Sequence, residues 1–165
     1  MNLIFVRHGQ SLWNLENKFT GWVDVGLSER GKKEASSAGL KLKDKGFMPD
    51  VCYTSYLNRS KDTANIILDN IEKGKNFKIL NYWELNERHY GALQGLDKIE
   101  TAKKYGEDQV QLWRRSFDVK PPSIDESSDH NPKNDPTLAD LIKEQNISSD
   151  VANMVHHRRD LDALG

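Results

Sequence analysis

The sequence opens on a short apolar run that ends in three residues of different chemistry. Leu3–Val6 has the length and composition of a buried strand, and Arg7, His8 and Gly9 follow it directly. A buried strand of this kind delivers reactive side chains to the carboxyl edge of a sheet. An imidazole can accept a phosphoryl group when a cation holds the phosphate and a glycine lets it approach the backbone. We therefore predict that His8 is a nucleophile and Arg7 its cation; the alternative is a structural histidine.

Strand and helix patterns alternate along the first half of the chain. Their order indicates a parallel sheet with right-handed crossovers, and hence an α/β fold. Ligands of such sheets bind beyond the carboxyl ends of the strands, where His8 is expected. The predicted elements are a strand over 3–6, a helix over 28–46 capped by Ser28, a strand over 51–54, a helix capped by Ser55, and a strand over 77–80.

Several polar residues of this half are candidate ligand contacts. Ser11 and Asn14 lie one helical turn apart and can donate hydrogen bonds to phosphate oxygens, although Ser11 can equally cap a helix. Thr20 and the backbone of Gly21 lie in a loop that can contact a ligand. Arg59 falls in the first turn of a predicted helix. A cation there opposes the helix dipole, which favours an anion contact over a stabilising role.

Residues 83–95 show no clean helical or strand period and are dense in acidic, basic and aromatic groups. Glu87 beside Arg88 is a candidate general acid/base, because a hydroxyl that attacks or leaves phosphorus must exchange a proton. The alternative is a surface ion pair worth less than about 1 kcal/mol. The following helical segment is rich in basic residues, at Lys98, Lys103, Lys104, Arg114 and Arg115.

The composition changes after Phe117. Residues 118–137 are rich in proline, aspartate, serine and asparagine, which predicts an extended or disordered connector. Beyond it lie two modest amphipathic patches, over 138–142 and 151–164. We therefore expect an α/β domain over 1–117 and a tail over 118–165 that is either part of the same domain or disordered.

The length, charge balance and cysteine content of the chain constrain its partners and its cellular compartment. The chain has 165 residues, the size of one domain, and 24 basic against 25 acidic residues. This balance argues against a nucleic-acid-binding or membrane-surface protein. The single cysteine, Cys52, cannot form an internal disulfide, which is typical of a reducing compartment. With no signal peptide and no apolar run of membrane-spanning length, the sequence predicts a cytoplasmic protein.

Taken together, these motifs resemble the cofactor-dependent phosphoglycerate mutases of the histidine phosphatase superfamily. The resemblance covers residues 1 to about 122 and implies a three-layer α/β/α sandwich. The segment Asn86–Gly91 is the part that separates mutases from simple phosphatases of the superfamily. The matching motifs, in the family's order, are Arg7–Gly9, Phe19–Trp22, Tyr53–Ser55, Leu85–Gly91 and Trp113–Ser116.

The resemblance also implies roles for individual residues. His8 becomes a phosphohistidine, Arg7 and Arg59 are its phosphate clamps, and Glu87 donates and accepts the hydroxyl proton. Interconversion of 3-phosphoglycerate and 2-phosphoglycerate follows, with phosphoglycerates as the small-molecule ligands, 2,3-bisphosphoglycerate as primer and no metal. The substrate-binding residues implied are Ser11, Asn14, Thr20, Gly21, Arg88, Tyr90, Lys98, Arg114 and Arg115.

The last quarter departs from the family pattern. Family members continue through a buried strand that neighbours the first strand and ends in a second catalytic histidine followed by glycine. Here His156 and His157 are followed by arginine and lack a preceding apolar strand. We therefore expect a sheet that is incomplete at its C-terminal end, with exposed strand edges that could pair in a homo-oligomer. Three readings follow: a working mutase, a histidine-type phosphomonoesterase, or an inactive mutase fragment that at most binds phosphoglycerates.

Overall fold

The computed structural model describes residues 2–145 and 147, and the chain forms two compact units. Unit 1 combines the chain up to Leu15 with Asp24–Leu85. Unit 2 combines Glu16–Val23 with the chain from Asn86 onward. Each unit is described by itself below.

The sheet of unit 1 is parallel, as predicted. Strands β1 (Cys52–Thr54) and β2 (Ile79–Asn81) pair in register, with Cys52 opposite Ile79. Strand β2 begins two residues later than expected, but the Cys52 amide donates to the Lys78 carbonyl at 2.9 Å, so pairing starts just ahead of it. The α/β class and the strand–helix–strand order are confirmed for this part of the chain.

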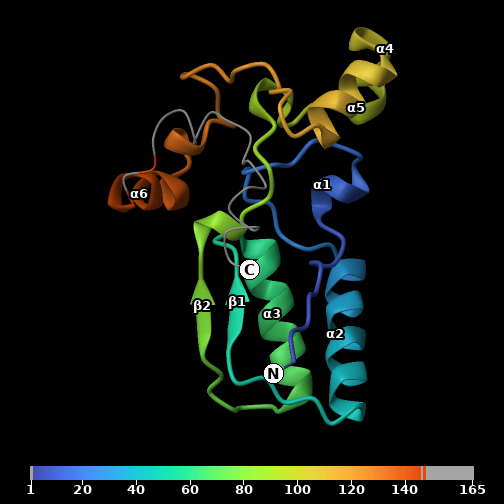
Figure 1. Ribbon diagram of the computed structural model, residues 1–165, viewed down its shortest axis with the longest axis vertical. Helices are drawn as coiled ribbons and strands as arrows, with labels where there is room; N and C mark the ends of the chain where they lie inside the picture. Colours follow the sequence, from blue (N-terminus) through green and yellow to red (C-terminus); the bar gives the residue numbers. More distant parts are fainter. Residues whose placement is uncertain (1, 146, 148–165) are drawn as a thin grey trace. The chain divides into compact units, whose positions relative to one another are not determined.

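Two helices pack against each other next to this sheet. Helices α2 (Glu29–Asp44) and α3 (Asn58–Ile71) lie side by side (Figure 1). They approach closely at Gly39, where a Cβ atom would lie 2.7 Å from the carbonyl oxygen of Ile67. The shared core consists of Ala35, Ile67, Leu68 and Ile71, with Cys52 and Ile79 packed against it from the strands.

The two predicted helix caps have different outcomes. The prediction for Ser28 is confirmed, because its hydroxyl accepts from the Gly31 amide at 3.1 Å. The prediction for Ser55 is wrong: α3 begins after Leu57, which makes no side-chain cap. Ser55 lies too early to reach the first turn of the helix, and its hydroxyl accepts from the Leu57 amide at 3.3 Å instead.

The prediction of a buried strand over Leu3–Val6 is also wrong. The structure assigns no strand there, and Leu3 and Phe5 are 70% and 88% exposed. The sheet found among the described residues has two strands, and Leu3–Val6 joins neither of them. A strand needs a neighbour for its backbone hydrogen bonds. An apolar run alone therefore does not suffice. The short helix α1 (Leu12–Leu15) follows.

Unit 2 is built around two short helices. The sequence suggests one helical segment after Lys98, but the structure has α4 (Lys98–Tyr105) and α5 (Glu107–Arg115). They are separated by Gly106, whose φ of +88° lies outside the range that a helix uses. Phe19, Leu93, Val110 and Trp113 form the buried core of the unit.

The remaining elements are short. Helices η1 (Trp83–Leu85) and η2 (Gly91–Leu93) lie in the segment over 83–95, which lacks a clean helical or strand period. Helices η3 (Pro132–Asn134) and α6 (Pro136–Glu144) begin inside the predicted connector. Asp135 caps α6, and Leu138 and Leu141 are buried, which confirms the first amphipathic patch. The second patch, with His156 and His157, lies outside the described residues.

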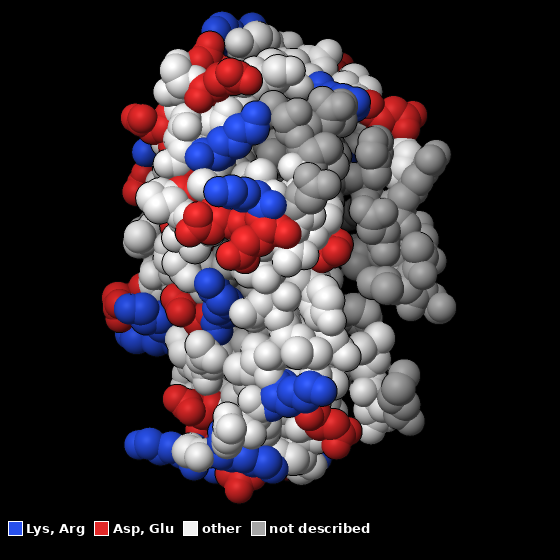
Figure 2. Space-filling view, turned by 90° about the vertical axis from the view of Figure 1, so that its left-hand side faces the viewer, with Lys and Arg blue, Asp and Glu red and all other residues white. Residues whose placement is uncertain are grey.

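Two ion pairs run along the exposed surface of α2. Arg30 contacts Glu34 at 2.8 Å and Lys32 contacts Glu29 at 2.7 Å. Figure 2 shows basic and acidic side chains interspersed on one face of the molecule. Among the described residues, no helix combines the length and the apolar character that crossing a membrane requires.

Candidate active site

The imidazole of His8 is oriented by its own chain. Its Nδ1 lies 2.7 Å from the carbonyl oxygen of Gly9. A carbonyl oxygen can only accept a hydrogen bond, so we assign the ring proton to Nδ1. The lone pair of the neutral ring is then on Nε2, the atom suited to attack phosphorus.

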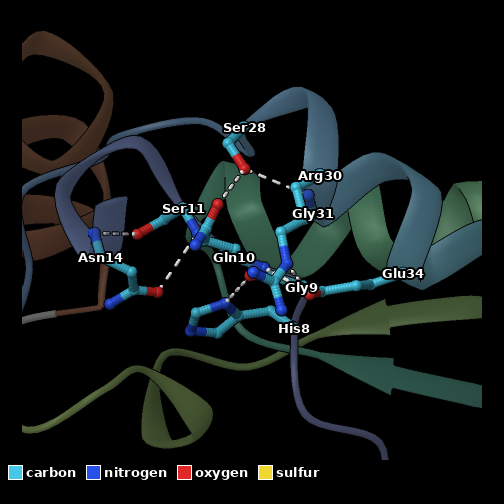
Figure 3. A network of polar contacts seen from close by, with 9 residues as sticks. All are labelled: His8, Gly9, Gln10, Ser11, Asn14, Ser28, Arg30, Gly31 and Glu34. Carbon is cyan, nitrogen blue, oxygen red and sulfur yellow. Dashed lines mark hydrogen bonds and ion pairs between the residues drawn. The ribbon is translucent and has the colours of Figure 1, made fainter. Parts of the chain in front are cut away.

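The loop that carries His8 is attached to helices α2 and α3. The Gly9 amide donates to Thr63 Oγ1 of α3 at 3.3 Å, and the Gln10 amide donates to Glu34 Oε2 of α2 at 2.9 Å. Figure 3 shows the α2 side of this network. The loop is thereby held by hydrogen bonds although it belongs to no strand.

Two backbone segments cross in close contact at Gly9 and Gly31, and this glycine crossing allows the attachment. A Cβ atom on Gly9 would collide with the carbonyl oxygen of Gly31, and one on Gly31 would collide with that of Gln10. Close to the crossing, the Ser28 amide donates to the Gln10 carbonyl at 2.8 Å and its hydroxyl donates to Gln10 Oε1 at 2.9 Å. The backbone after His8 can therefore lie directly on the N-terminus of α2.

Ser11 and Asn14 bond to each other's backbone. The Ser11 amide donates to Asn14 Oδ1 at 3.2 Å, and the Asn14 amide donates to Ser11 Oγ at 3.1 Å. This reciprocal arrangement is typical of a capped helix start. It favours the capping role for Ser11, and the phosphate contact stays a prediction for both residues.

The predicted phosphate clamps differ in their environment. Arg7 is exposed and lines a surface depression of about 390 Å³ together with His8, Gly9, Gln10, Asn14 and Glu34. Arg59, in the first turn of α3, is only 1% exposed. Its carbonyl accepts from the Thr63 hydroxyl at 2.7 Å, so its helical turn is linked to the His8 loop through Thr63.

In unit 2, Glu87 and Arg88 make hydrogen bonds to other residues of the unit. The Glu87 carbonyl accepts from Trp22 Nε1 at 2.8 Å. Arg88 donates to the carbonyls of Trp113 and Ser116 at 2.9 and 2.5 Å. Its guanidinium thus caps the C-terminus of α5, as cations commonly do.

Tyr90 lies among the charged candidates of this unit. Its ring packs on Phe19 with centroids 5.2 Å apart. Burial, followed by the charge of Glu87, raises the pKa of Tyr90, while Arg114, Arg88 and Arg115 act in the opposite direction. Glu87 and the arginines predicted to bind substrate thus act in opposite directions on the pKa of Tyr90.

The remaining candidates of unit 2 lie around Phe19. Thr20 is buried, and Gly21 has a φ of +58°. Lys98 Nζ lies 5.9 Å from the centre of the Phe19 ring. These three residues thus lie close to Phe19 in the chain or in space, and their contact with substrate stays a prediction.

Sequence reasoning missed Gln10, Glu34 and Thr63, which hold the His8 loop, and Gln94 in unit 2. Gln94 accepts from the Trp22 amide at 2.8 Å and donates to the His130 carbonyl at 2.9 Å. No local signal marks such residues, because their partners lie far away in the sequence.

Comparison with known families gives one family-model match. The model of the histidine phosphatase superfamily (branch 1) matches residues 3–164. This match continues beyond residue 122, where the resemblance was expected to end.

Curated relatives are similar over most of this chain. One is a 2,3-bisphosphoglycerate-dependent phosphoglycerate mutase of Lachnoclostridium phytofermentans, 56% identical over 81% of this chain and 53% of its own length. Another, with the same name, comes from Borreliella afzelii and is 54% identical over 87% of this chain and 57% of its own length. The chain therefore spans just over half the length of these relatives.

Solved structures of similar fold are more distant in sequence. "Mycobacterial hydrolase 1" superposes with a TM-score of 0.60 at 25% identity, covering 84% of this chain and 61% of that one. A mycobacterial glucosyl-3-phosphoglycerate phosphatase gives a TM-score of 0.58 at 26% identity, covering 84% of this chain and 65% of that one.

Proposed function

The chain belongs to the histidine phosphatase superfamily, and on this basis we propose that His8 accepts a phosphoryl group and passes it on. The observation that carries the proposal is the hydrogen bond from His8 Nδ1 to the Gly9 carbonyl, because it leaves the lone pair on Nε2. Attack forms a bond between Nε2 and phosphorus while the donor's phosphorus–oxygen bond breaks. The departing oxygen takes up a proton.

Other residues of unit 1 support this step. Arg7 is an exposed cation beside the nucleophile, suited to hold phosphate oxygens by charge-assisted hydrogen bonds. The fixed Nδ1 proton keeps the ring from turning, so Nε2 is presented in one orientation. Arg59 is proposed as a second clamp from its matching position in the family motif.

For the whole reaction we propose a mutase that interconverts 3-phosphoglycerate and 2-phosphoglycerate. The names of the relatives at 54–56% identity support it. When bound, 2,3-bisphosphoglycerate supplies the phosphoryl group that primes His8, and the arginine and histidine of the surface depression fit such an anion. Glu87 is the proposed proton donor and acceptor. The substrate's carboxylate and second phosphate are assigned to Thr20, Gly21, Arg88, Tyr90, Lys98, Arg114 and Arg115.

Phosphate-ester hydrolysis is the second candidate. Solved neighbours are named as a hydrolase and a phosphatase, and in such a reaction water replaces the acceptor hydroxyl at the same phosphohistidine. A third candidate is binding of phosphoglycerates without turnover, because His156 and His157 are followed by arginine and do not match the family's second catalytic histidine.

One set of assays separates these functions. We would measure 2-phosphoglycerate formed from 3-phosphoglycerate with 2,3-bisphosphoglycerate added, and phosphate release in the same samples. A mutase produces isomer with little phosphate, and a phosphatase produces phosphate without isomer. His8→Ala should abolish either activity, while Lys32→Gln, an exposed change on α2, should not. Calorimetric binding of 3-phosphoglycerate without any turnover would leave only the third candidate.

A further inference from the structure

One peptide group connects a carboxylate to the proposed nucleophile. The peptide between Gly9 and Gln10 accepts from His8 Nδ1 through its carbonyl, at 2.7 Å. Its N–H donates to Glu34 Oε2, at 2.9 Å. Glu34 and His8 thus bond to opposite ends of the same planar unit (Figure 3).

Glu34 is itself held in place as an anion. Its second oxygen, Oε1, accepts from Arg30 Nε at 2.8 Å, one turn earlier on α2. The Gln10 amide, followed by Arg30, lowers the pKa of Glu34. The carboxylate is therefore charged at neutral pH, and both of its oxygens are engaged.

The charge of Glu34 acts on the imidazole through the peptide. An anion that accepts the N–H polarises the amide and makes its carbonyl oxygen a stronger acceptor, because hydrogen bonds in a chain strengthen one another. The stronger acceptor favours the proton on Nδ1. It also restrains the ring, as partners of metal-binding histidines do.

We propose that Glu34 is a positioning residue for His8, acting through the Gly9–Gln10 peptide to fix the tautomer and the orientation of the nucleophilic ring. Its effect on rate rests on the proposed function, since it matters only if His8 takes up a phosphoryl group. Its effect on the tautomer of His8 does not depend on the proposed function.

A purely structural role, in which Glu34 only holds the loop on α2, can be told apart from an effect on the His8 ring. The Gln10 carbonyl and side chain are bound to Ser28 by two hydrogen bonds that do not involve Glu34. The Gly9 amide is bound to Thr63. Substituting Glu34 should therefore leave the loop on α2 while removing the charge from the peptide.

The test compares Glu34→Ala and Glu34→Gln in the full chain. Glutamine retains an oxygen that can accept from the Gln10 amide but carries no charge. The control is Glu29→Gln, which removes an exposed carboxylate of the same helix that pairs with Lys32. The first readout is the ¹⁵N spectrum of the His8 ring, assigned with His8→Ala, which reports the fraction of Nδ1–H tautomer. The second is the rate at which His8 takes up acid-labile phosphate from 2,3-bisphosphoglycerate.

We expect the Nδ1–H fraction to fall in Glu34→Ala, to be intermediate in Glu34→Gln, and to be unchanged in Glu29→Gln. The phosphorylation rate should fall about ten-fold in Glu34→Ala, the lower end of the effect of removing a supporting partner. A wild-type Nδ1–H fraction in both Glu34 variants would overturn the proposal. If even the wild type takes up no phosphate, the proposed function fails, and the tautomer fractions still decide the role of Glu34.

Discussion

The candidate residues of the two units are held by different means. In unit 1, the His8 loop is fixed through its backbone amides, which bond to Thr63 and Glu34 on two helices. In unit 2, it is a candidate side chain, Arg88, that is engaged, at the end of α5. In unit 1, the ring of the proposed nucleophile is therefore oriented by a hydrogen bond of its own Nδ1, while the loop around it is held by backbone amides. In unit 2, a residue predicted to bind substrate also supports the fold.

The largest effect should come from breaking the glycine crossing in unit 1. Gly31 lies in the first turn of α2, where helix propensity alone favours alanine by about 1 kcal/mol. A Cβ atom there would collide with the Gln10 carbonyl oxygen, which belongs to the backbone and cannot turn away. We expect Gly31→Ala to destabilise the protein by about 3 kcal/mol, as overpacking does, and to abolish His8 phosphorylation.

Urea unfolding measures the change in the free energy of unfolding. A gain in stability would reflect helix propensity, and a loss would reflect the collision of the added Cβ atom. Gly26→Ala is the matched control, because a Cβ atom there has no neighbour within 4 Å. It should shift the free energy of unfolding by less than about 0.5 kcal/mol. A more stable Gly31→Ala protein with normal phosphorylation would show that the crossing does not exist in solution.

A smaller loss is expected from removing the arginine cap in unit 2. Arg88→Met keeps a long side chain but leaves the carbonyls of Trp113 and Ser116 without their donor, at a cost of about 2 kcal/mol. Thermal unfolding followed by circular dichroism would show it. Lys103→Ala, which removes an exposed ion pair with Glu100, should cost less than about 1 kcal/mol. If Arg88→Met lost substrate affinity at full stability, Arg88 would serve the ligand alone.

The sequence was informative where structure is local. The cap at Ser28, the parallel order of β1 and β2 and the burial of Ala35 all follow from patterns within one or two elements. The strand over Leu3–Val6 did not form, because strand formation depends on a partner elsewhere in the chain.

The same reason limits how much of the site could be predicted. His8 and Arg7 are recognisable from their motif, but the residues that hold the loop are not. Gln10 and Glu34 are 24 residues apart, and Gly9 and Thr63 are 54 apart. Nothing in the local composition of α2 or α3 marks either partner, so the hydrogen bonds that assign the tautomer of His8 emerge only from the fold.

The smallest effect concerns the charges around Tyr90 and sharpens the description of unit 2. Burial and the nearby Glu87 raise the pKa of Tyr90 in the folded protein. In the unfolded chain a tyrosine ionises near pH 10. The folded state therefore retains the phenol proton longer, so its stability is complete below about pH 10 and falls as the pH rises through the folded pKa. Tyr90→Phe has no proton to lose and should weaken this fall between about pH 9 and about pH 11.

Urea midpoints at the two pH values measure the difference in pH dependence between Tyr90→Phe and the wild type. Tyr53→Phe, on the exposed face of β1, is the control that should keep the wild-type pH dependence.

Glu87→Gln supplies the decisive comparison. Removing the carboxylate takes away one of the two causes that raise the pKa of Tyr90, while the arginines still lower it. The folded pKa of Tyr90 then lies closer to its value in the unfolded chain, so the alkaline loss of stability should be smaller than in the wild type, and the Tyr90 absorbance should titrate at a lower pH. Identical titration curves for Glu87→Gln and the wild type would mean that the carboxylate does not act on the Tyr90 hydroxyl, and the description of Tyr90 as influenced by the proposed proton donor would be wrong.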